Sequence, residues 1–303
     1  MASLRRSGLL ALLSVALVLL SLLAGGATAK RTGQLTVFWG RNKNEGSLRE
    51  ACDTGLYTTV IISFYSVFGH GRYWGDLSGH PMNGIGDDIK HCQSMKILVL
   101  LSIGGTGNDY SLPSSQSAND VADNLWNAHL SGRRTGVFRP FGDAVLDGID
   151  FFVDNGGADH YDELAWRLNW YGRYGGGKKA LHLTATPRCG YPDWRLEKAL
   201  STGLFERLHV RFYDDANCSY NHAGLKGVME QWNKWTAKYP RSSVYLGLIA
   251  ANVPGKNDMV NLKQLYYDLL PNVQKAANYG GVMLWDRFYD KQTGYGKAVT
   301  YWA

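Results

Sequence analysis

Eight short apolar runs, most of them followed by an amphipathic stretch, predict an α/β chain that forms a single (β/α)8 TIM barrel. Most runs are continuous rather than alternating, which is typical of parallel strands covered by helices. Eight strand–helix units over about 270 residues are what this barrel needs. The predicted strands are Leu35–Trp39, Thr58–Phe64, Ile97–Ile103, Val145–Val153, Leu181–Thr186, Leu208–Tyr213, Val244–Ala250 and Gly281–Trp285.

Amphipathic stretches between these runs predict the covering helices, among them Val121–Leu130, Tyr161–Leu168, Val228–Tyr239 and Leu262–Ala276. A doubly wound open sheet is the competing architecture. It fits less well because no Gly-x-Gly-x-x-Gly turn follows the first strand. The sequence contains no linker or low-complexity segment, so residues 30–303 are expected to form one domain.

Residues 1–29 have the three parts of a secretory signal peptide: Arg5 and Arg6, the apolar run Leu9–Leu23, and the small-residue cleavage site Ala27-Thr28-Ala29. A signal anchor is the alternative, but the apolar run is short for a membrane span. We therefore expect an extracellular, apoplastic protein without a membrane segment. Loss of the two arginines lowers the net charge from +6 to +4. This mild positive charge suits an acidic partner and is too weak to indicate nucleic acid.

Four cysteines in a secreted chain favour two disulfides, for which three connectivities exist. We expect Cys52–Cys92, on consecutive helices, and Cys189–Cys218, on either side of one strand. A metal site is disfavoured because no Cys-x-x-Cys pair occurs, and no cofactor is expected. Asn217 begins the N-glycosylation sequon, which a disulfide at Cys218 would partly shield.

Aromatic residues recur where the predicted strands end, and a barrel carries its chemistry at that end. Trp39, Tyr213 and Trp285 are three of them. Aromatic rings stack on the apolar faces of sugars, so the pattern indicates a sugar-binding mouth. The alternative is that these rings only close the barrel.

Two strand motifs, Ser102-Ile103-Gly104-Gly105 and Asp147-Gly148-Ile149-Asp150, resemble the signatures of glycoside hydrolase family 18. Residues 38–48 resemble the opening of the plant class III chitinases. Arg49–Asp53, Asp88–Ser94 and Leu284–Arg287 resemble the cereal xylanase inhibitor proteins, a chitinase-derived family. The resemblance spans the mature chain and implies a barrel with the two disulfides given above. It also implies cis peptide bonds at 63–64 and 285–286.

The resemblance implies that the catalytic motif has changed. In these chitinases the substrate's own acetamido group is the nucleophile, and the strand ends in Asp-x-Asp-x-Glu. The first Asp corresponds to Asp150, the orienting Asp to Phe152, and the acid Glu to Asp154. A carboxyl shorter by one methylene, roughly 1 Å, costs a proton donor about 10²-fold. We expect no meaningful chitinase activity.

A working short acid at Asp154 is the alternative, since buried carboxyls do serve as acids. It is disfavoured because nothing in the motif replaces the Asp lost at Phe152. If the rest of the mouth were intact, Phe152→Asp with Asp154→Glu would restore some activity. Asp147 and Asp150 are interpreted as structural.

The segment Arg167–Lys179 holds four cations, no acid and a glycine run, which predicts a protruding cationic loop. The inhibitor family uses this loop against family 11 xylanases with an Arg at its tip. That position is Tyr174 here, and Arg173 lies one place earlier. Lys178 and Lys179 follow and are expected to steer association. The alternative is an ordinary solvated connection.

The amphipathic stretch Leu262–Pro271 corresponds to a helix by which the inhibitor family contacts family 10 xylanases. The family's Lys is Lys263, followed here by Gln264-Leu265 and the pair Tyr266 and Tyr267. The alternative is a plain barrel helix.

The sequence therefore predicts a secreted, monomeric, catalytically inactive chitinase-like protein that inhibits microbial endo-xylanases in plant defence, with family 11 ranked above family 10 as the target. Three alternatives stay open: a glycan-binding lectin-like protein, a weak residual chitinase, and a storage or stress protein.

Overall fold

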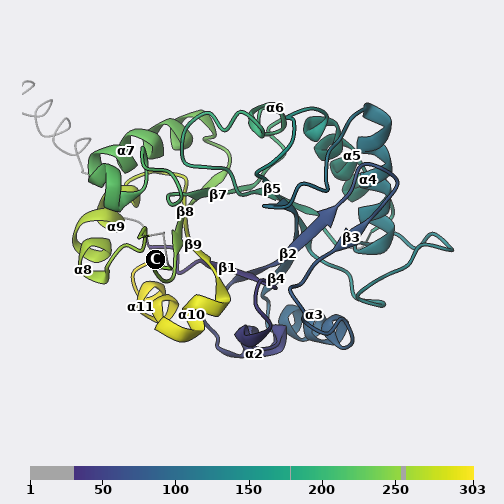
Figure 1. Cartoon of the computed structure of the whole chain (residues 1–303), viewed down its shortest axis with the longest axis horizontal. Coiled ribbons are helices and arrows are strands. Elements are labelled where there is room, and N and C mark those ends of the chain that lie inside the picture. The colour runs from purple at the N-terminus through teal and green to yellow at the C-terminus, as the bar shows by residue number, and fades with distance from the viewer. Residues whose placement is uncertain (1–30, 178, 254–256) are drawn as a thin grey trace, which may run out of the picture.

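The computed structural model describes residues 31–177, 179–253 and 257–303, so the predicted signal peptide and Lys178 lie outside the described residues. The chain forms a closed barrel of parallel strands ringed by helices (Figure 1), as the sequence predicts. The strands are β1 (Leu35–Trp39), β2 (Thr59–Val67), β4 (Leu98–Gly105), β5 (Gly148–Val153), β6 (His182–Ala185), β7 (Arg207–Arg211), β8 (Ser243–Ile249) and β9 (Tyr279–Trp285).

The strand order is β1-β9-β8-β7-β6-β5-β4-β2, and pairing of β1 with β2 closes the ring. One further strand, β3 (Trp74–Gly75), pairs antiparallel with the end of β2 and was not predicted because two residues carry no periodic pattern. The predicted strand Val145–Val153 begins only at Gly148. The Asp147 carboxylate accepts the backbone N–H of Val99, so these residues brace the sheet instead of extending it.

Helices surround the ring in the order of the chain (Figure 1). They are α2 (Leu48–Asp53), α3 (Ile85–Ser94), α4 (Ser115–Ala128), α5 (Tyr161–Tyr174), α6 (Glu197–Leu200), α7 (Tyr220–Lys238), α8 (Leu262–Gln264), α9 (Leu270–Val273), α10 (Arg287–Thr293) and α11 (Tyr295–Thr300), with the 3-10 turn η1 (Lys43–Glu45) and the π-helical turn η2 (Leu265–Leu269).

The helix predicted over Leu262–Ala276 is interrupted by the π-helical turn η2 before α9 begins. Pro271 has no N–H to donate to the residue four places earlier, so the regular α-helical pattern cannot run through this point. The predicted helix Tyr161–Leu168 continues to Tyr174, which changes the interpretation of the cationic segment below.

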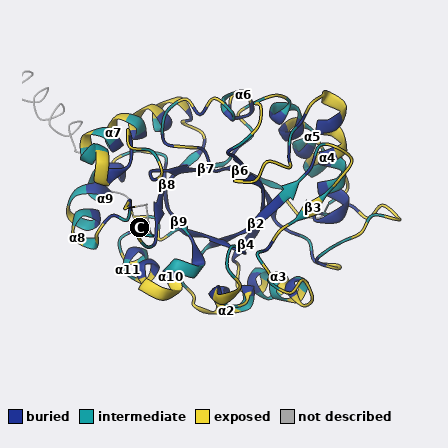
Figure 2. Ribbon diagram, in the orientation of Figure 1, coloured by how far each residue is buried: buried dark blue, intermediate teal, exposed yellow. Residues whose placement is uncertain are grey.

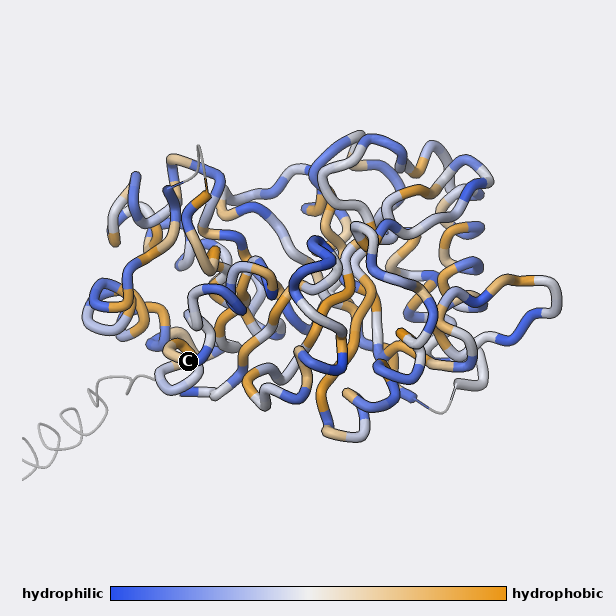
Figure 3. The backbone as a smooth tube through the Cα atoms, turned by 60° about the horizontal axis from the view of Figure 1, so that its bottom comes forward, coloured by the Kyte–Doolittle hydropathy of each residue, from blue (hydrophilic) through white to orange (hydrophobic). Residues whose placement is uncertain are grey.

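The burial of residues follows the two layers of the barrel, the inner strands and the outer helices. The strands are buried, and each long helix turns one face toward them and the other toward solvent (Figure 2). The strand segments are also the most hydrophobic part of the backbone (Figure 3). Inside the ring, a separate apolar cluster includes Phe38, Phe64 and Phe152, whereas the larger core lies between the strands and the helices.

Both predicted disulfides are present, Cys52–Cys92 and Cys189–Cys218. The first joins α2 to α3, and the second joins the segments before and after β7. The peptide bonds at 63–64 and 285–286 are both cis, as the family resemblance implies. In the part of the chain that the structure describes, every helix is too short or too polar to cross a bilayer.

Candidate functional site

The carboxylate of Asp150 lies inside the barrel and is fully buried. It accepts hydrogen bonds from the hydroxyls of Ser102 at 2.8 Å, Thr184 at 2.7 Å and Thr186 at 3.0 Å. These donors belong to β4, β6 and the segment after β6. The ring nitrogen Nδ1 of His209 lies 3.5 Å away, and burial lowers the pKa of that imidazole. Asp150 thus joins three neighbouring strands through its own side chain.

Phe152 takes part in a cluster of aromatic rings at the end of β5. Its ring centroid lies 5.8 Å from that of Phe38, 5.0 Å from Phe64 and 5.7 Å from Trp285. The guanidinium of Arg211 covers the same ring at 4.1 Å. Phe152 is 2% exposed, so hydrocarbon and a cation fill the position where the chitinase motif has a carboxylate.

Asp154 is held by two arginines. Arg211 donates from Nη2 to Oδ1 at 2.6 Å and from Nη1 to Oδ2 at 3.1 Å, which is a bidentate pair. The Nε of Arg188 donates to Oδ1 at 3.1 Å. Burial alone would raise the pKa of Asp154, but the hydrogen bonds and charges of Arg211 and then Arg188 outweigh it and lower that pKa. The carboxylate is therefore ionised at neutral pH.

The sequence interpretation missed both arginines. Arg211 ends the largely buried strand β7, and only 4% of it is exposed. A buried guanidinium needs a carboxylate partner, so an Arg within an apolar run was a usable signal. Arg188 offered no such signal because it lies after β6, in an isolated bridge to Arg211, and about half of its side chain is exposed.

The three residues predicted to form a sugar-binding mouth do not lie together on an open surface. Trp39 is 1% exposed and packs against His80, and its Nε1 donates to the carbonyl of Gly46, so its role in the mouth stays a prediction. Tyr213 is 4% exposed, and burial raises the pKa of its hydroxyl. Trp285 is partly exposed and stacks on Phe64.

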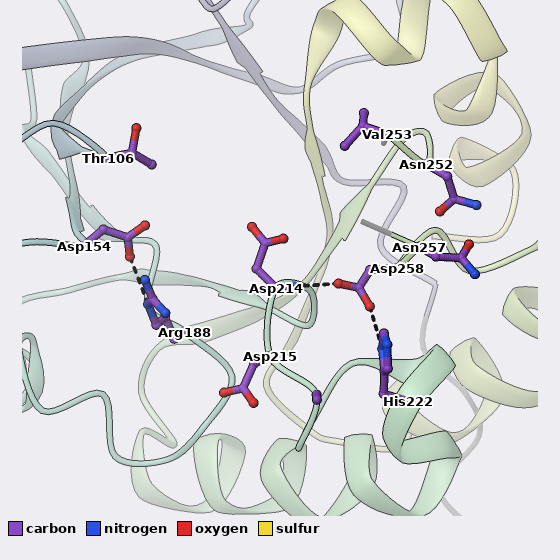
Figure 4. Close-up of a pocket in the computed structure, with 11 residues that line it drawn as sticks. Thr106, Asp154, Arg188, Asp214, Asp215, His222, Asn252, Val253, Asn257 and Asp258 are labelled. Atoms are coloured by element: carbon purple, nitrogen blue, oxygen red, sulfur yellow. Dashed lines mark hydrogen bonds and ion pairs between the residues drawn. The ribbon is translucent and has the colours of Figure 1, made fainter. Parts of the chain in front are cut away.

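A cavity of about 720 Å³ opens beside Asp154 (Figure 4). Its lining is polar and includes Arg188, Asp214, Asp258 and His222. The Asp258 carboxylate accepts the backbone N–H of Asp214 at 2.9 Å and contacts the His222 ring at 3.0 Å. These residues follow β7 and β8 in the chain, and their spacing in the sequence gave no indication that they would meet.

Asp286 is a second buried carboxyl at this end of the barrel. It caps α10 by accepting the backbone N–H of Tyr289 at 3.2 Å. Burial, and after it the charge of Glu45, raises the pKa of Asp286 to about 7. Its role as a helix cap accounts for its position.

The segment predicted as a protruding cationic loop is largely helical. Arg167 to Tyr174 form the last turns of α5. The glycine run does not free a tip, because Gly175 and Gly177 lie against the ring of Trp126, where a Cβ atom would come within 2.7 and 3.1 Å. Close packing, not freedom to protrude, accounts for these glycines.

The predicted cations of this segment have different surroundings. Arg173 and Tyr174 are exposed at the end of α5, and among the described residues Arg173 forms no ion pair. Lys179 pairs with Asp147 at 2.9 Å before β6, and its predicted part in steering association stays a prediction. Lys178 lies outside the described residues.

On the second predicted surface, Lys263 and Tyr267 are exposed, and 82% of Tyr267 is accessible to solvent. Tyr266 turns inward, packs against Trp302 and donates its hydroxyl to the carbonyl of Ala298 at 2.8 Å. Its predicted role as a contact residue stays a prediction, and its hydroxyl is already hydrogen-bonded within the chain.

The remaining predicted positions concern modification and metal binding. Asn217 is exposed, although its neighbour Cys218 is buried, so the expected shielding of the sequon is not seen at Asn217 itself. Among the described residues, Cys189, Asp215 and Cys218 come close enough to hold a metal ion. Both cysteines are disulfide-bonded and supply no thiolate.

Comparison with known proteins identifies the family of the chain. The family described as "Glycosyl hydrolases family 18" matches residues 34–268. Xylanase inhibitor protein 1 of Oryza sativa subsp. japonica is 71% identical over 100% of both chains, and Xylanase inhibitor protein 1 of Triticum aestivum is 51% identical over 100% of this chain and 99% of that protein. The crystal structure of a xylanase and alpha-amylase inhibitor protein from Scadoxus multiflorus has a TM-score of 0.83 at 37% identity, covering 89% of this chain and 98% of the other. The chain therefore belongs to glycosyl hydrolase family 18.

Proposed function

We propose that this protein is a catalytically inactive member of its family that inhibits microbial endo-xylanases, with family 11 ranked above family 10 as the target. The observation that carries the loss of catalysis is the Asp154 carboxylate, which two arginines hold at 3.1 Å or less. A general acid must carry its proton at working pH, and Arg211 and Arg188 favour the ionised form of Asp154.

The position of Phe152 supports the same conclusion. Hydrolysis assisted by an acetamido group needs a carboxylate that orients the group and balances the positive charge of the intermediate. Here a phenyl ring lies beneath the cation of Arg211, which would repel that charge. The barrel mouth therefore lacks both the proton donor and the orienting anion.

The proposed target follows from the relatives. Two cereal relatives at 71% and 51% identity are named xylanase inhibitor proteins, and the structural relative from Scadoxus is named an inhibitor of xylanase and alpha-amylase. Xylanase active sites contain a pair of carboxyl groups. An exposed arginine of this chain is a suitable partner for such a pair, because a guanidinium binds carboxylates with two donors.

The outer end of α5 is the surface that we propose for family 11 xylanases. Arg173 lies there beside Tyr174, which is 69% exposed, and Trp170, which is 44% exposed. A cavity of about 500 Å³ lies on this face and is lined by these three residues and by Trp166. Trp, Tyr and Arg are the residues that contribute most to binding in protein interfaces. Arg173 supplies the charge, and the aromatic rings exclude water around it.

The exposed pair Lys263 and Tyr267 is the second contact, proposed for family 10 xylanases. It has one cation and one accessible ring, and the hydroxyl of Tyr266 is already bonded to the carbonyl of Ala298. We expect this contact to be weaker than the one at α5. The proposal also includes secretion into the apoplast, a monomeric state and a role in plant defence.

Weak glycan binding is a second candidate function, favoured by the partly exposed ring of Trp285 at the barrel mouth. It does not compete with inhibition. The end of α5 leads into the start of β6, so it lies at the opposite end of the barrel from the mouth.

A paired assay tests the proposed function. The purified protein is measured against a chitooligosaccharide and against several xylanases of families 10 and 11. We expect no hydrolysis and inhibition of at least one family 11 enzyme. A chitooligosaccharide added in excess should leave the inhibition unchanged. Inhibition that the sugar relieves would place the contact at the mouth, and a lack of inhibition across the panel would refute the proposal.

A further inference from the structure

A groove of about 540 Å³ lies on the side of the barrel, between the β2–β3 hairpin and the segment that follows α4. We call it the β3 groove and define it by Tyr73, Trp74, Asn124, His129 and Phe138. Its volume falls within the range of small-molecule sites, which are mostly apolar with a few polar groups. It shares no lining residue with the surface on α5 or with the cavity beside Asp154.

Two exposed aromatic side chains form the walls of the β3 groove. Trp74 is 67% exposed and Phe138 is 77% exposed. They come from segments far apart in the sequence and line the same groove. Large apolar side chains that gather around a concave surface are typical of binding sites, whereas single exposed ones are common everywhere.

Polar groups lie at the floor. The Tyr65 hydroxyl donates to Oδ1 of Asn124 at 2.9 Å. His129 is 5% exposed, its ring lies edge-on to Tyr65 with centroids 5.7 Å apart, and its Nδ1 has no hydrogen-bond partner among the described residues. A buried polar atom without a partner costs stability, so an unpaired nitrogen here calls for an explanation.

The β3 groove offers a ligand no free charge. Burial, and then the charge of Arg139, lowers the pKa of His129 to about 3, so its imidazole is neutral. The carboxylate of Asp76, which also lines the groove, pairs with Arg41 at 3.3 Å. The ring of His80 contacts Glu45 at 2.9 Å. A neutral ligand therefore suits this lining better than an ion.

We propose that the β3 groove binds a small, neutral, hydroxyl-bearing aromatic molecule, with its ring between Trp74 and Phe138 and its hydroxyl toward Asn124 and His129. Aromatic walls favour a flat ring through edge and stacked contacts. The amide and imidazole at the floor offer both donors and acceptors for one hydroxyl. This site is independent of xylanase inhibition and goes beyond it.

Binding of three matched probes to the full protein tests the proposal: 4-ethylphenol, ethylbenzene and 4-ethylbenzoate, measured by saturation-transfer NMR and by titration calorimetry. We expect 4-ethylphenol to bind best and 4-ethylbenzoate worst. The double variant Trp74→Ala, Phe138→Ala should raise the Kd for 4-ethylphenol about tenfold or more, since it removes both walls. Trp194→Ala, which removes an exposed tryptophan outside the groove and outside the α5 surface, is the control and should leave this Kd unchanged.

The variant His129→Phe tests the polar floor of the groove separately from its aromatic walls. This variant should raise the Kd for 4-ethylphenol about fivefold and leave the Kd for ethylbenzene unchanged, because only the hydroxyl of 4-ethylphenol loses a hydrogen-bond partner. Equal affinity for all three probes, no binding of any probe, or binding that survives the double wall variant would each overturn the proposal. Association of two protein copies that the wall variant abolishes would also overturn it, since the groove would then hold a second chain. The wall variant decides the matter even if His129→Phe fails to fold.

Discussion

The barrel mouth and the outer end of α5 contain the same pairing of residue types, an arginine above an aromatic ring, in opposite surroundings. At the mouth, Arg211 covers Phe152 at 4.1 Å, and both side chains are buried. On α5, Arg167 covers Trp170 at 4.6 Å, and Trp170 is 44% exposed. The buried pair neutralises Asp154 and fills space. The exposed pair leaves Trp170 and the neighbouring Arg173 accessible to a partner.

Under the proposed function, this contrast would explain how a family fold loses one activity and supports another. At the barrel mouth, the carboxylate of Asp154 and the guanidinium of Arg211 pair with each other. These residues therefore stabilise the barrel without offering a free charge. The α5 surface contributes little to the core and is free to vary. Recognition can therefore develop at the outer surface while the centre keeps the fold.

The largest effect should come from Arg211→Ala, which would leave the Asp154 carboxylate buried with Arg188 as its remaining partner. Removal of one member of a buried ion pair costs about 3–5 kcal/mol of unfolding free energy. Urea unfolding measures this loss. The control Arg188→Ala removes a half-exposed partner and should cost about 1 kcal/mol or less. Equal losses for both variants would mean that the mouth is not held by the buried pair.

Next in size is Arg173→Ala, which should weaken inhibition of a family 11 xylanase by about 2–5 kcal/mol, since it leaves a carboxylate of the enzyme buried without its partner. The inhibition constant measures the effect, and the unfolding free energy should not change. Arg72→Ala, which removes another exposed arginine, is the matched control. Inhibition that is undiminished after both Arg173→Ala and Tyr174→Ala would remove α5 from the proposed contact.

Lys263→Ala should have a smaller effect and weaken inhibition of a family 10 xylanase by about 1 kcal/mol. The reason is that an exposed lysine forms a solvated contact. The same variant should inhibit a family 11 enzyme as well as the original protein does. A loss of inhibition toward both enzyme families would show that the two surfaces act as one.

The acid stability of the mouth provides a further test. The pKa of Asp154 is lowered in the folded protein, so its ionised form stabilises the fold above the ordinary Asp pKa of about 4, and this contribution is lost as pH falls through the folded value. Asp154→Asn lacks the titrating group. The difference in melting temperature between the original protein and the variant should therefore shrink below about pH 4. A difference in melting temperature that stays constant over this range would show that the arginines do not lower the pKa of Asp154 in the folded protein.

The last prediction concerns a double variant that should gain no hydrolytic activity. Phe152→Asp with Asp154→Glu would restore the family's acidic residues, yet we expect no hydrolysis of a chitooligosaccharide. Arg211 lies close to both positions and would pair with the new carboxylates. Measurable turnover by this double variant would show that the mouth is closer to a working site than its geometry indicates.

Much of the fold could be predicted from the sequence. The apolar runs identified all eight barrel strands, because burial of parallel strands demands continuous hydrophobicity. The expected pairing of Cys52 with Cys92, on consecutive helices, is confirmed. The missed strand β3 and the interrupted helix at η2 depend on local geometry at two or five residues, which periodicity cannot detect.

The sequence by itself determined the residue types in the catalytic motif. Because Phe152 and Asp154 stand in it, the Asp-x-Asp-x-Glu ending is absent. Only the tertiary structure decided that Arg211 from β7 meets Asp154, that Trp39 and Tyr266 turn inward, and that the glycines after α5 pack on Trp126. The reason is physical. Hydrophobic pattern is a local property of the chain, whereas an ion pair or a close approach depends on which distant segments the closed barrel brings together.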